Sequence, residues 1–189
     1  TVYGLGANAY LAESARKVYA AKGRPSDNPL IVHVNDSADA SLFAETNETY
    51  KKLAKRFMPG PLTVILPKKD VIPDEVTGGL RTVAVRCPSN PIARELIRRS
   101  GVPIAAPSAN LSGKPSPTCA EHVMQDMDGR IAMVIDGGEC EIGLESTVIA
   151  VSGNSANVLR PGAVTPDMLR SAGIAVTVDE AVTDPAKAG

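Results

Sequence analysis

Aromatic side chains are scarce in this chain of 189 residues, which has no tryptophan and an aromatic content of 3%. RNA-binding modules commonly stack bases on aromatic rings, so this composition disfavours such a module. An excess of one charge is also missing, since 20 Lys and Arg nearly balance 21 Asp and Glu for a formal net charge of −1. Any anion site must therefore be local rather than an extended basic surface.

Cysteines and long apolar segments are few as well. Cys87, Cys119 and Cys140 show neither Cys-x-x-Cys nor Cys/His spacing, which argues against a disulfide framework or a structural zinc site. We therefore expect reduced thiols. We find no signal peptide, and no apolar run approaches the length of a membrane span, which predicts a soluble, cytoplasmic protein without membrane contact.

The length and the 43% apolar content allow a sizeable core, and we expect a single catalytic domain over residues 1–178. The acidic, unpatterned stretch at 179–189 is predicted to be a linker or frayed tail. Because the chain begins at Thr1 without a Met, we expect an upstream strand in the natural protein. The sequence leaves open a second domain after Gly189.

Strand-like and helix-like segments alternate along the chain, which is typical of an α/β fold. Predicted strands lie at 30–34, 62–66, 82–86, 102–106, 133–135, 148–151, 158–160 and 174–178. Predicted helices lie at 11–22, 49–57, 91–100 and 120–127, with a last short one from Thr165 and Pro166. Gly4-Leu-Gly6-Ala-Asn-Ala9 matches a dinucleotide fingerprint, but no strand precedes it, so a tight turn is the better interpretation.

A loop of hydroxyl and proline residues at 105–118 follows on the apolar strand predicted at 102–106. Its three prolines lower the entropy cost of holding the Ser and Asn side chains in place. Thr118 and Glu121 form a Thr-x-x-Glu capping box before the next helix, and Asn90 caps helix 91–100. Both a rigid polar site and an ordinary surface connection fit this loop.

Cations and hydroxyls stand at several predicted strand and helix ends. Lys22 and Arg24 end the first helix, although a charge favoured by the helix dipole also accounts for Lys22. Thr82 and Arg86 point to one face of an alternating strand, although Arg86 also fits an edge-strand charge. Ligands bind at strand ends in open α/β sheets, so these groups indicate a local anion site.

Three further residues fit the same arrangement. Ser146 precedes the strand at 148–151, and Arg160 stands before a Pro-Gly break much as Arg24 stands before Pro25. His33 lies inside an apolar strand, where a satisfied core residue and the neutral wall of a pocket both remain open.

Six motifs follow one another between Thr1 and about Leu169: Thr-Val-Tyr-Gly-Leu-Gly, Lys-Gly-Arg-Pro-x-x-Asn-Pro-Leu, Pro-Gly-Pro-Leu-Thr, Ala-Pro-Ser-Ala-Asn-x-Ser-Gly, Gly-Leu-Glu-Ser-Thr and Leu-Arg-Pro-Gly. In this order they resemble the YrdC-like family, the threonylcarbamoyl-AMP synthases of tRNA modification. The family's Pro-Thr-Glu lead-in before Thr1 is missing here. The resemblance implies an α/β sandwich with a twisted mixed sheet and a large concave ligand cavity.

The resemblance also implies roles for residues that match the family's motifs. The expected catalytic residues are those of its Lys-x-Arg and Ser-x-Asn motifs: Lys22, Arg24, Ser108 and Asn110. The expected ATP-binding residues are Arg24, Asn28, Thr82, Ser108, Ser116 and Arg160. The expected threonine-binding residues are Thr1, His33, Arg86, Ala106 through its backbone, and Ser146.

The implied reaction condenses L-threonine, bicarbonate or CO2, and ATP into threonylcarbamoyl-AMP and pyrophosphate, for threonylcarbamoyladenosine formation in tRNA. No carboxylate cluster predicts a dedicated metal site, so Mg2+ is expected to arrive with ATP. The implied partners are downstream tRNA threonylcarbamoyl-transfer proteins, together with a weak RNA contact. Two alternatives stay open: an RNA-binding module of the same fold, and a carbamoyltransferase domain that uses carbamoyl phosphate.

Overall fold

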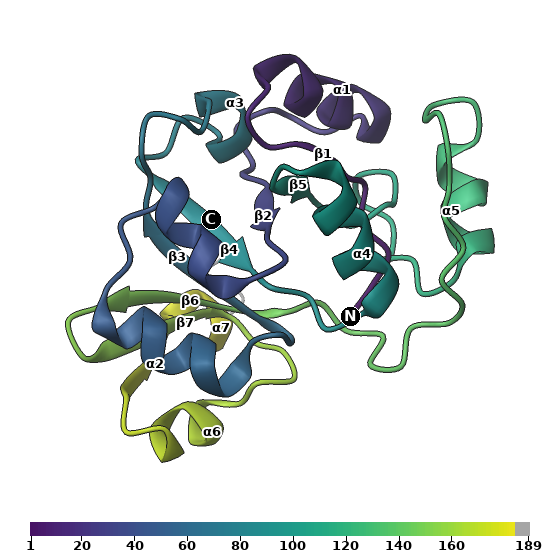
Figure 1. The fold of residues 1–189 in the computed structure, drawn as a ribbon. Coiled ribbons are helices and arrows are strands. Elements are labelled where there is room, and N and C mark those ends of the chain that lie inside the picture. Colours follow the sequence, from purple (N-terminus) through teal and green to yellow (C-terminus); the bar gives the residue numbers. More distant parts are fainter. Residues whose placement is uncertain (184–189) are drawn as a thin grey trace.

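The computed structural model describes residues 1–183 and contains an eight-stranded mixed sheet, in the order β1-β5-β2-β4-β3-β6-β7-β8 (Figure 1). The strands are β1 Ala7–Asn8, β2 Ile31–His33, β3 Leu62–Pro67, β4 Thr82–Arg86, β5 Ile104–Ala106, β6 Thr147–Ser152, β7 Ser155–Arg160 and β8 Ala175–Val178. Neighbours β2/β4, β3/β6 and β7/β8 are parallel and the other pairs antiparallel. The prediction of an α/β fold with a mixed sheet is confirmed.

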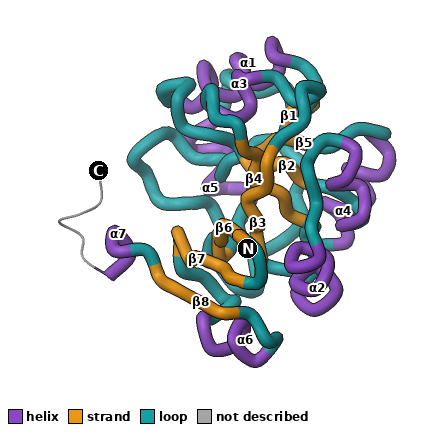
Figure 2. The backbone as a smooth tube through the Cα atoms, turned by 90° about the vertical axis from the view of Figure 1, so that its left-hand side faces the viewer, coloured by secondary structure: helices purple, strands orange, loops and turns teal. Residues whose placement is uncertain are grey.

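The helices alternate with the strands along most of the chain. They are α1 Ala12–Lys22, the short 3-10 helix η1 Ser37–Leu42, α2 Glu48–Phe57, α3 Asp74–Thr77, α4 Pro91–Ser100, α5 Ala120–Met127, α6 Pro166–Ser171 and α7 Glu180–Thr183. Figure 2 shows the strands running through the middle of the molecule, with α1 and α3 at one end of the sheet and α6 at the other. No helix among the described residues has the length and apolar character needed to cross a bilayer.

The two faces of the sheet differ in burial, because successive side chains of a strand point to opposite faces. One face is fully buried against α1, α2 and α6, and its residues are Val32, Leu62, Val64, Leu66, Val83, Val85, Ala105, Ile149, Ala156 and Val158. On the other face, many side chains are only half-buried: Ile31, His33, Ile65, Thr82, Ala84, Ile104, Val148 and Ala150. The helices thus leave one sheet face accessible.

The N-terminal segment is extended rather than turned. Gly4 bridges to Ser108, and β1 pairs antiparallel with β5, so the tight turn predicted at the glycines is wrong. Gly6 is needed for close approach, since a Cβ there would lie 2.9 Å from the Ile104 side chain. The pairing places this segment beside the hydroxyl-rich loop.

Two local predictions differ from the structure. Residues 133–135 form no strand, and Met133 and Ile135 are 74% and 43% exposed, because no neighbouring strand pairs with this segment. The predicted capping box at Thr118 is also absent, since the N-cap of α5 is Cys119 and makes no side-chain cap bond.

Two other predicted helix starts, those of α4 and α6, are confirmed. The Asn90 side chain accepts hydrogen bonds from the backbone N–H groups of Ile92 and Ala93, and Thr165 accepts one from Met168. The cysteines are free thiols, as expected. At the predicted tail, the backbone N–H of Asp179 donates to Val158 O over 2.9 Å and α7 follows, while residues 184–189 lie outside the described residues.

Candidate functional site

The strand register forms a row of residues across the open face of the sheet. Residues paired on β5, β2, β4, β3, β6 and β7 are Ile104, His33, Arg86, Thr63, Val148 and Arg160. A second row, one step further along the strands, is apolar and contains Ala106, Ile31, Ala84, Ile65 and Ala150. The open face therefore carries a polar row with two arginines beside an apolar row.

A β-bulge directs Arg160 to this face. Ile149 pairs with Val158, but Val148 pairs with Arg160, so one residue of β7 is unpaired between them. Without the bulge, Leu159 would take the place opposite Val148 and Arg160 would point to the buried face. The irregular register thus brings a cation onto the polar row.

Arg86 is a buried cation, only 8% exposed, without a carboxylate partner among the described residues. Its Nε donates to Gly60 O over 3.2 Å and its Nη2 to Thr1 Oγ1 over 2.7 Å. Burial and, to a smaller extent, the nearby charge of Arg160 together lower the pKa of Arg86 to about 10. Because Arg160 lies on the same sheet face and no acid among the described residues neutralises Arg86, this part of the site favours an anion.

His33 is neutral in the folded chain. Burial lowers its pKa to about 3, with a further contribution from the charge of Arg86. Its Nδ1 lies 3.3 Å from Ile104 O, which assigns the proton to Nδ1 and leaves Nε2 as an acceptor. A neutral His33 bonded to a backbone carbonyl fits both alternatives, the satisfied core residue and the neutral wall of a pocket.

Lys22, at the end of α1, binds the backbone of the hydroxyl-rich loop. Its Nζ donates to the carbonyl oxygens of Ser108 and Asn110, and the Lys22 carbonyl accepts from the Ser112 N–H over 3.1 Å. The pKa of Lys22 is lowered to about 8, mainly by burial and also by the charge of Arg24, while the charge of Glu145 acts in the opposite direction. The Asn110 side chain is held in the same loop, since its Nδ2 donates to Leu111 O and Lys114 O. Both residues thus shape the loop.

Several other predicted site residues keep their polar side-chain atoms available. The half-buried Arg24 guanidinium and the hydroxyls of Thr82 and Ser108 have no hydrogen-bond or ion-pair partner within residues 1–183. Burial lowers the pKa of Arg24. Asn28 is exposed, and its carbonyl accepts from the Tyr19 hydroxyl over 3.0 Å. These side chains can therefore meet a ligand without giving up a bond inside the protein.

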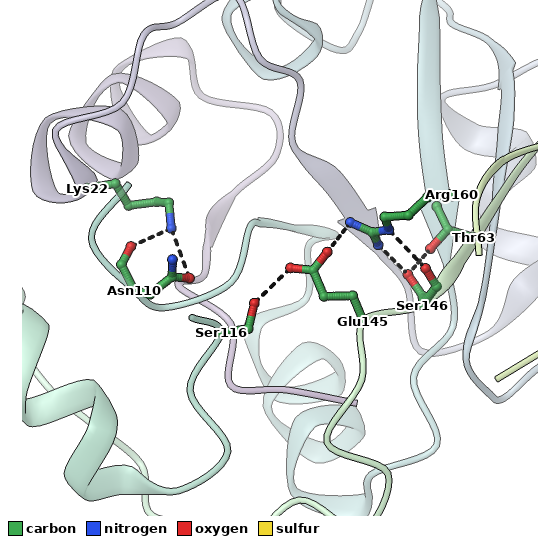
Figure 3. Close-up of polar contacts among 7 residues, drawn as sticks. All are labelled: Lys22, Thr63, Asn110, Ser116, Glu145, Ser146 and Arg160. Atoms are coloured by element: carbon green, nitrogen blue, oxygen red, sulfur yellow. Dashed lines mark hydrogen bonds and ion pairs between the residues drawn. The ribbon is translucent and has the colours of Figure 1, made fainter. Parts of the chain in front are cut away.

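Ser116 and Arg160 are brought together by Glu145, which sequence reasoning did not single out (Figure 3). Ser116 Oγ donates to Glu145 Oε1 over 2.9 Å, and Arg160 Nη1 donates to Glu145 Oε2. Only the position of Glu145 directly before Ser146, within the Gly-Leu-Glu-Ser-Thr motif, could have pointed to it.

Ser146 is buried and has partners on two sides (Figure 3). Its Oγ lies 2.8 Å from Thr63 Oγ1 and accepts from Arg160 Nη2 over 3.1 Å. Arg160 Nε also donates to Ser146 O over 3.1 Å. Thr63, which was not predicted as a site residue, thus belongs to the same network. The strand register, which pairs Thr63 with Arg86, places its side chain on this face.

Two surface hollows are lined by other residues. One, of about 480 Å³, is lined by acidic residues of α3 and the segment before β2, and another, of about 150 Å³, lies beside Arg94 and Cys87. Neither contains a predicted site residue. Within the described residues, no group of three or more His, Cys, Asp or Glu side chains could hold a metal ion.

Residues 1–162 match the family model Sua5_yciO_yrdC, described as "Telomere recombination". The chain is 54% identical over 186 residues to the threonylcarbamoyl-AMP synthase of Bacillus subtilis, covering 97% of this chain and 54% of that protein. It is 55% identical over 163 residues to the threonylcarbamoyl-AMP synthase of Pyrococcus abyssi, covering 86% of this chain and 48% of that protein. The crystal structure of P. abyssi Sua5 complexed with L-threonine matches with a TM-score of 0.89 and 50% identity, covering 94% of this chain and 53% of that one. The chain spans about half the length of these relatives.

Proposed function

The chain belongs to the Sua5_yciO_yrdC family, and from this membership we propose that it synthesises threonylcarbamoyl-AMP from L-threonine, bicarbonate or CO2, and ATP. The observation that supports this most directly is the pair of cations without carboxylate partners, Arg86 and Arg24, within the described residues. The segment after Arg24 leads into the start of β2, whereas Arg86 ends the parallel β4. The open face between them suits a ligand with two anionic parts.

The amino-acid half of the site lies around Arg86. A buried guanidinium with no acid beside it favours the carboxylate of L-threonine, because charge-assisted bonds to carboxylates are strong. Neutral His33 can accept from the threonine hydroxyl through Nε2, and Thr1, Ser146 and the Ala106 backbone complete this half. Its neighbour among solved structures, P. abyssi Sua5, is itself complexed with L-threonine.

The nucleotide half lies toward the hydroxyl-rich loop and Arg160. Arg24 and Arg160 neutralise phosphate charge, while Ser108, Thr82, Asn28 and Ser116 supply hydrogen bonds. Lys22 and Asn110 act as positioning residues, because their bonds go to the backbone of the loop that carries Ser108. We expect the loop and the open sheet face to enclose the concave cavity that the family resemblance implies.

The reaction needs no protein nucleophile. The threonine amine loses a proton and forms an N–C bond to CO2, and a carbamate oxygen then attacks the α-phosphate while the bond to pyrophosphate breaks. The protein contributes by positioning the reactants and stabilising the charge that develops on the phosphates. Mg2+ is expected to arrive bound to the triphosphate, and the product to pass to tRNA threonylcarbamoyl-transfer proteins in the cytoplasm.

The proposal is tested by measuring pyrophosphate release from ATP with each component left out in turn. We expect release to require L-threonine and bicarbonate together. Serine should replace threonine poorly, because the missing methyl group costs about 1–3 kcal/mol of binding to the transition state. Equal release with and without threonine would overturn the assignment. Activity with carbamoyl phosphate in place of threonine and ATP would support a carbamoyltransferase, and RNA binding without any release would support an RNA-binding module.

A further inference from the structure

A carboxylate lies between two residues assigned to ATP by the proposed function. Glu145 accepts from Ser116 through one oxygen and from Arg160 through the other (Figure 3). Ser116 belongs to the loop after β5, whereas Arg160 ends β7. Glu145 therefore connects the two sides of the nucleotide half of the site.

The backbone under Glu145 is held in place by its neighbours. Thr147 N donates to Pro61 O over 2.9 Å, and Thr147 Oγ1 donates to Val164 O over 2.8 Å. Gly162 packs directly against this segment, since a Cβ there would lie 2.8 Å from Glu145 O. The Glu145 side chain thus projects from a fixed base, and at 36% exposure it remains within reach of a ligand.

Glu145 fixes the orientation of the Arg160 guanidinium. Arg160 uses Nε and Nη2 on Ser146 and Nη1 on Glu145, which holds the group from two sides. A guanidinium has more N–H groups than these bonds occupy, so some remain for phosphate oxygens. Arg160 can therefore keep Glu145 as a partner while it binds the nucleotide.

The contact with Glu145 also decides what Ser116 can offer to a ligand. An ionised carboxylate accepts hydrogen bonds only, so the single hydroxyl proton of Ser116 points to Glu145. Toward the nucleotide, Ser116 presents lone pairs. It can accept from a hydroxyl or amino group of the nucleotide but has no proton for a bare phosphate oxygen.

From these contacts we infer that Glu145 is a positioning residue of the nucleotide site, which orients Arg160 toward phosphate and sets Ser116 as a hydrogen-bond acceptor toward a nucleotide donor group. This inference rests on the proposed function only in taking ATP as the ligand. The carboxylate need not touch the reacting atoms, because it acts through Ser116 and Arg160.

The test is calorimetric titration of the full chain with ATP and Mg2+, comparing the unaltered chain with Glu145→Gln. A glutamine that keeps its oxygen on Arg160 must turn its NH2 group toward Ser116, which reverses the Ser116 hydroxyl. We expect the Kd for ATP to rise about ten- to a hundred-fold, as for loss of charge-assisted hydrogen bonds, and more than in Ser116→Ala. The Kd for L-threonine should change much less.

Two further variants sharpen this comparison. Glu139→Gln is the matched control, because it removes the same charge from an exposed position of the same segment and should leave the Kd for ATP unchanged. Glu145→Asp keeps the charge but is too short to span both partners, so it should weaken ATP binding as well. It also serves as the second variant if the Gln variant fails to fold.

Unchanged or tighter ATP binding by Glu145→Gln would overturn the inference, and tighter binding would mean that the carboxylate only repels the triphosphate. The same chain also separates this result from the proposed function. ATP binding that depends on Glu145, without threonine-dependent pyrophosphate release, would remove the function and keep the inference. Normal turnover, together with a Kd for ATP that does not depend on Glu145, would keep the proposed function and overturn the inference. Absence of ATP binding by the unaltered chain would overturn both the proposed function and the inference.

Discussion

Two residues of the site, Lys22 and Arg86, are buried cations that hydrogen-bond to neutral groups instead of carboxylates. Lys22, only 3% exposed, donates to backbone carbonyls, and Arg86 donates to a carbonyl and a hydroxyl. Taking a charge out of water without an acid partner costs free energy, which neutral acceptors repay only in part. These positions therefore lower stability in the empty protein and become favourable when an anion binds.

Lys22 should make stability depend on pH in the alkaline range. Its folded-state pKa is near 8, below the usual 10.5, so between these values the unfolded chain binds more protons. Through this residue, the free energy of unfolding should rise as the pH rises through that interval. Relative to Lys22→Met, the unaltered chain should gain about 1–3 kcal/mol between about pH 7 and pH 10, measured by urea denaturation.

The exposed Lys17, on the same helix, supplies the matched control for this measurement. Lys17→Met should follow the pH dependence of the unaltered chain. If the difference in unfolding free energy between Lys22→Met and the unaltered chain stayed constant with pH, Lys22 would have the same pKa in the folded and the unfolded chain.

Among the elements, α4 and α5 begin in different ways although both sequences predict a cap. Asn90 satisfies two backbone N–H groups at the start of α4. At α5, Thr118 Oγ1 lies 3.4 Å from His122 Nδ1 and makes no bond to a backbone N–H of the first turn. The N-cap of α5 is Cys119 instead of the predicted Thr118, and the Thr118 carbonyl accepts a hydrogen bond from the Cys140 N–H over 2.8 Å.

This difference predicts unequal effects of two similar substitutions. Asn90→Ala should lower the free energy of unfolding by about 0.5–2 kcal/mol, because it removes an N-cap. Thr118→Ala, which removes no cap, should cost less than about 0.5 kcal/mol. Urea denaturation of both variants measures the two effects, and equal losses would mean that Thr118 caps α5 in solution.

At the scale of the whole molecule, the sheet separates a closed core from an accessible face. Its buried face packs against α1, α2 and α6, whereas the half-buried face carries His33, Arg86 and Arg160 in one row. The stability of the domain therefore depends on residues that the site also uses. His33 shows this most directly, since it is neutral inside the fold and protonated in an unfolded chain at low pH.

The acid stability of the whole domain should reflect His33. Its folded-state pKa is about 3, below the usual 6.5, so below pH 6.5 the unfolded chain binds the extra proton and stability falls as the pH falls. Between about pH 7 and pH 4.5, the free energy of unfolding of the unaltered chain should fall by about 1–3 kcal/mol more than that of His33→Gln, measured by urea denaturation. The exposed His122 provides the control His122→Gln, which should lose as much as the unaltered chain. A His33→Gln variant with the same acid loss would contradict the buried neutral state.

The sequence by itself determined the features that depend on a few neighbouring residues. The alternation in β4, with Thr82 and Arg86 on one face, follows from the two-residue period of a strand, and the Asn90 cap follows from local hydrogen bonding. The order of the motifs was enough to indicate the family. The prediction of a strand at 133–135 was wrong, because a segment with β propensity forms a strand only where another strand pairs with it.

Only the tertiary structure decided how distant residues meet. Lys22 reaches the Ser108 carbonyl across 86 positions of the chain, and Glu145 joins Ser116 across 29. Arg160 faces the site because a bulge shifts its register by one residue, which no local pattern predicts. The physical reason is that sheet pairing and loop packing are long-range contacts, whose register depends on the whole core rather than on the sequence around each residue.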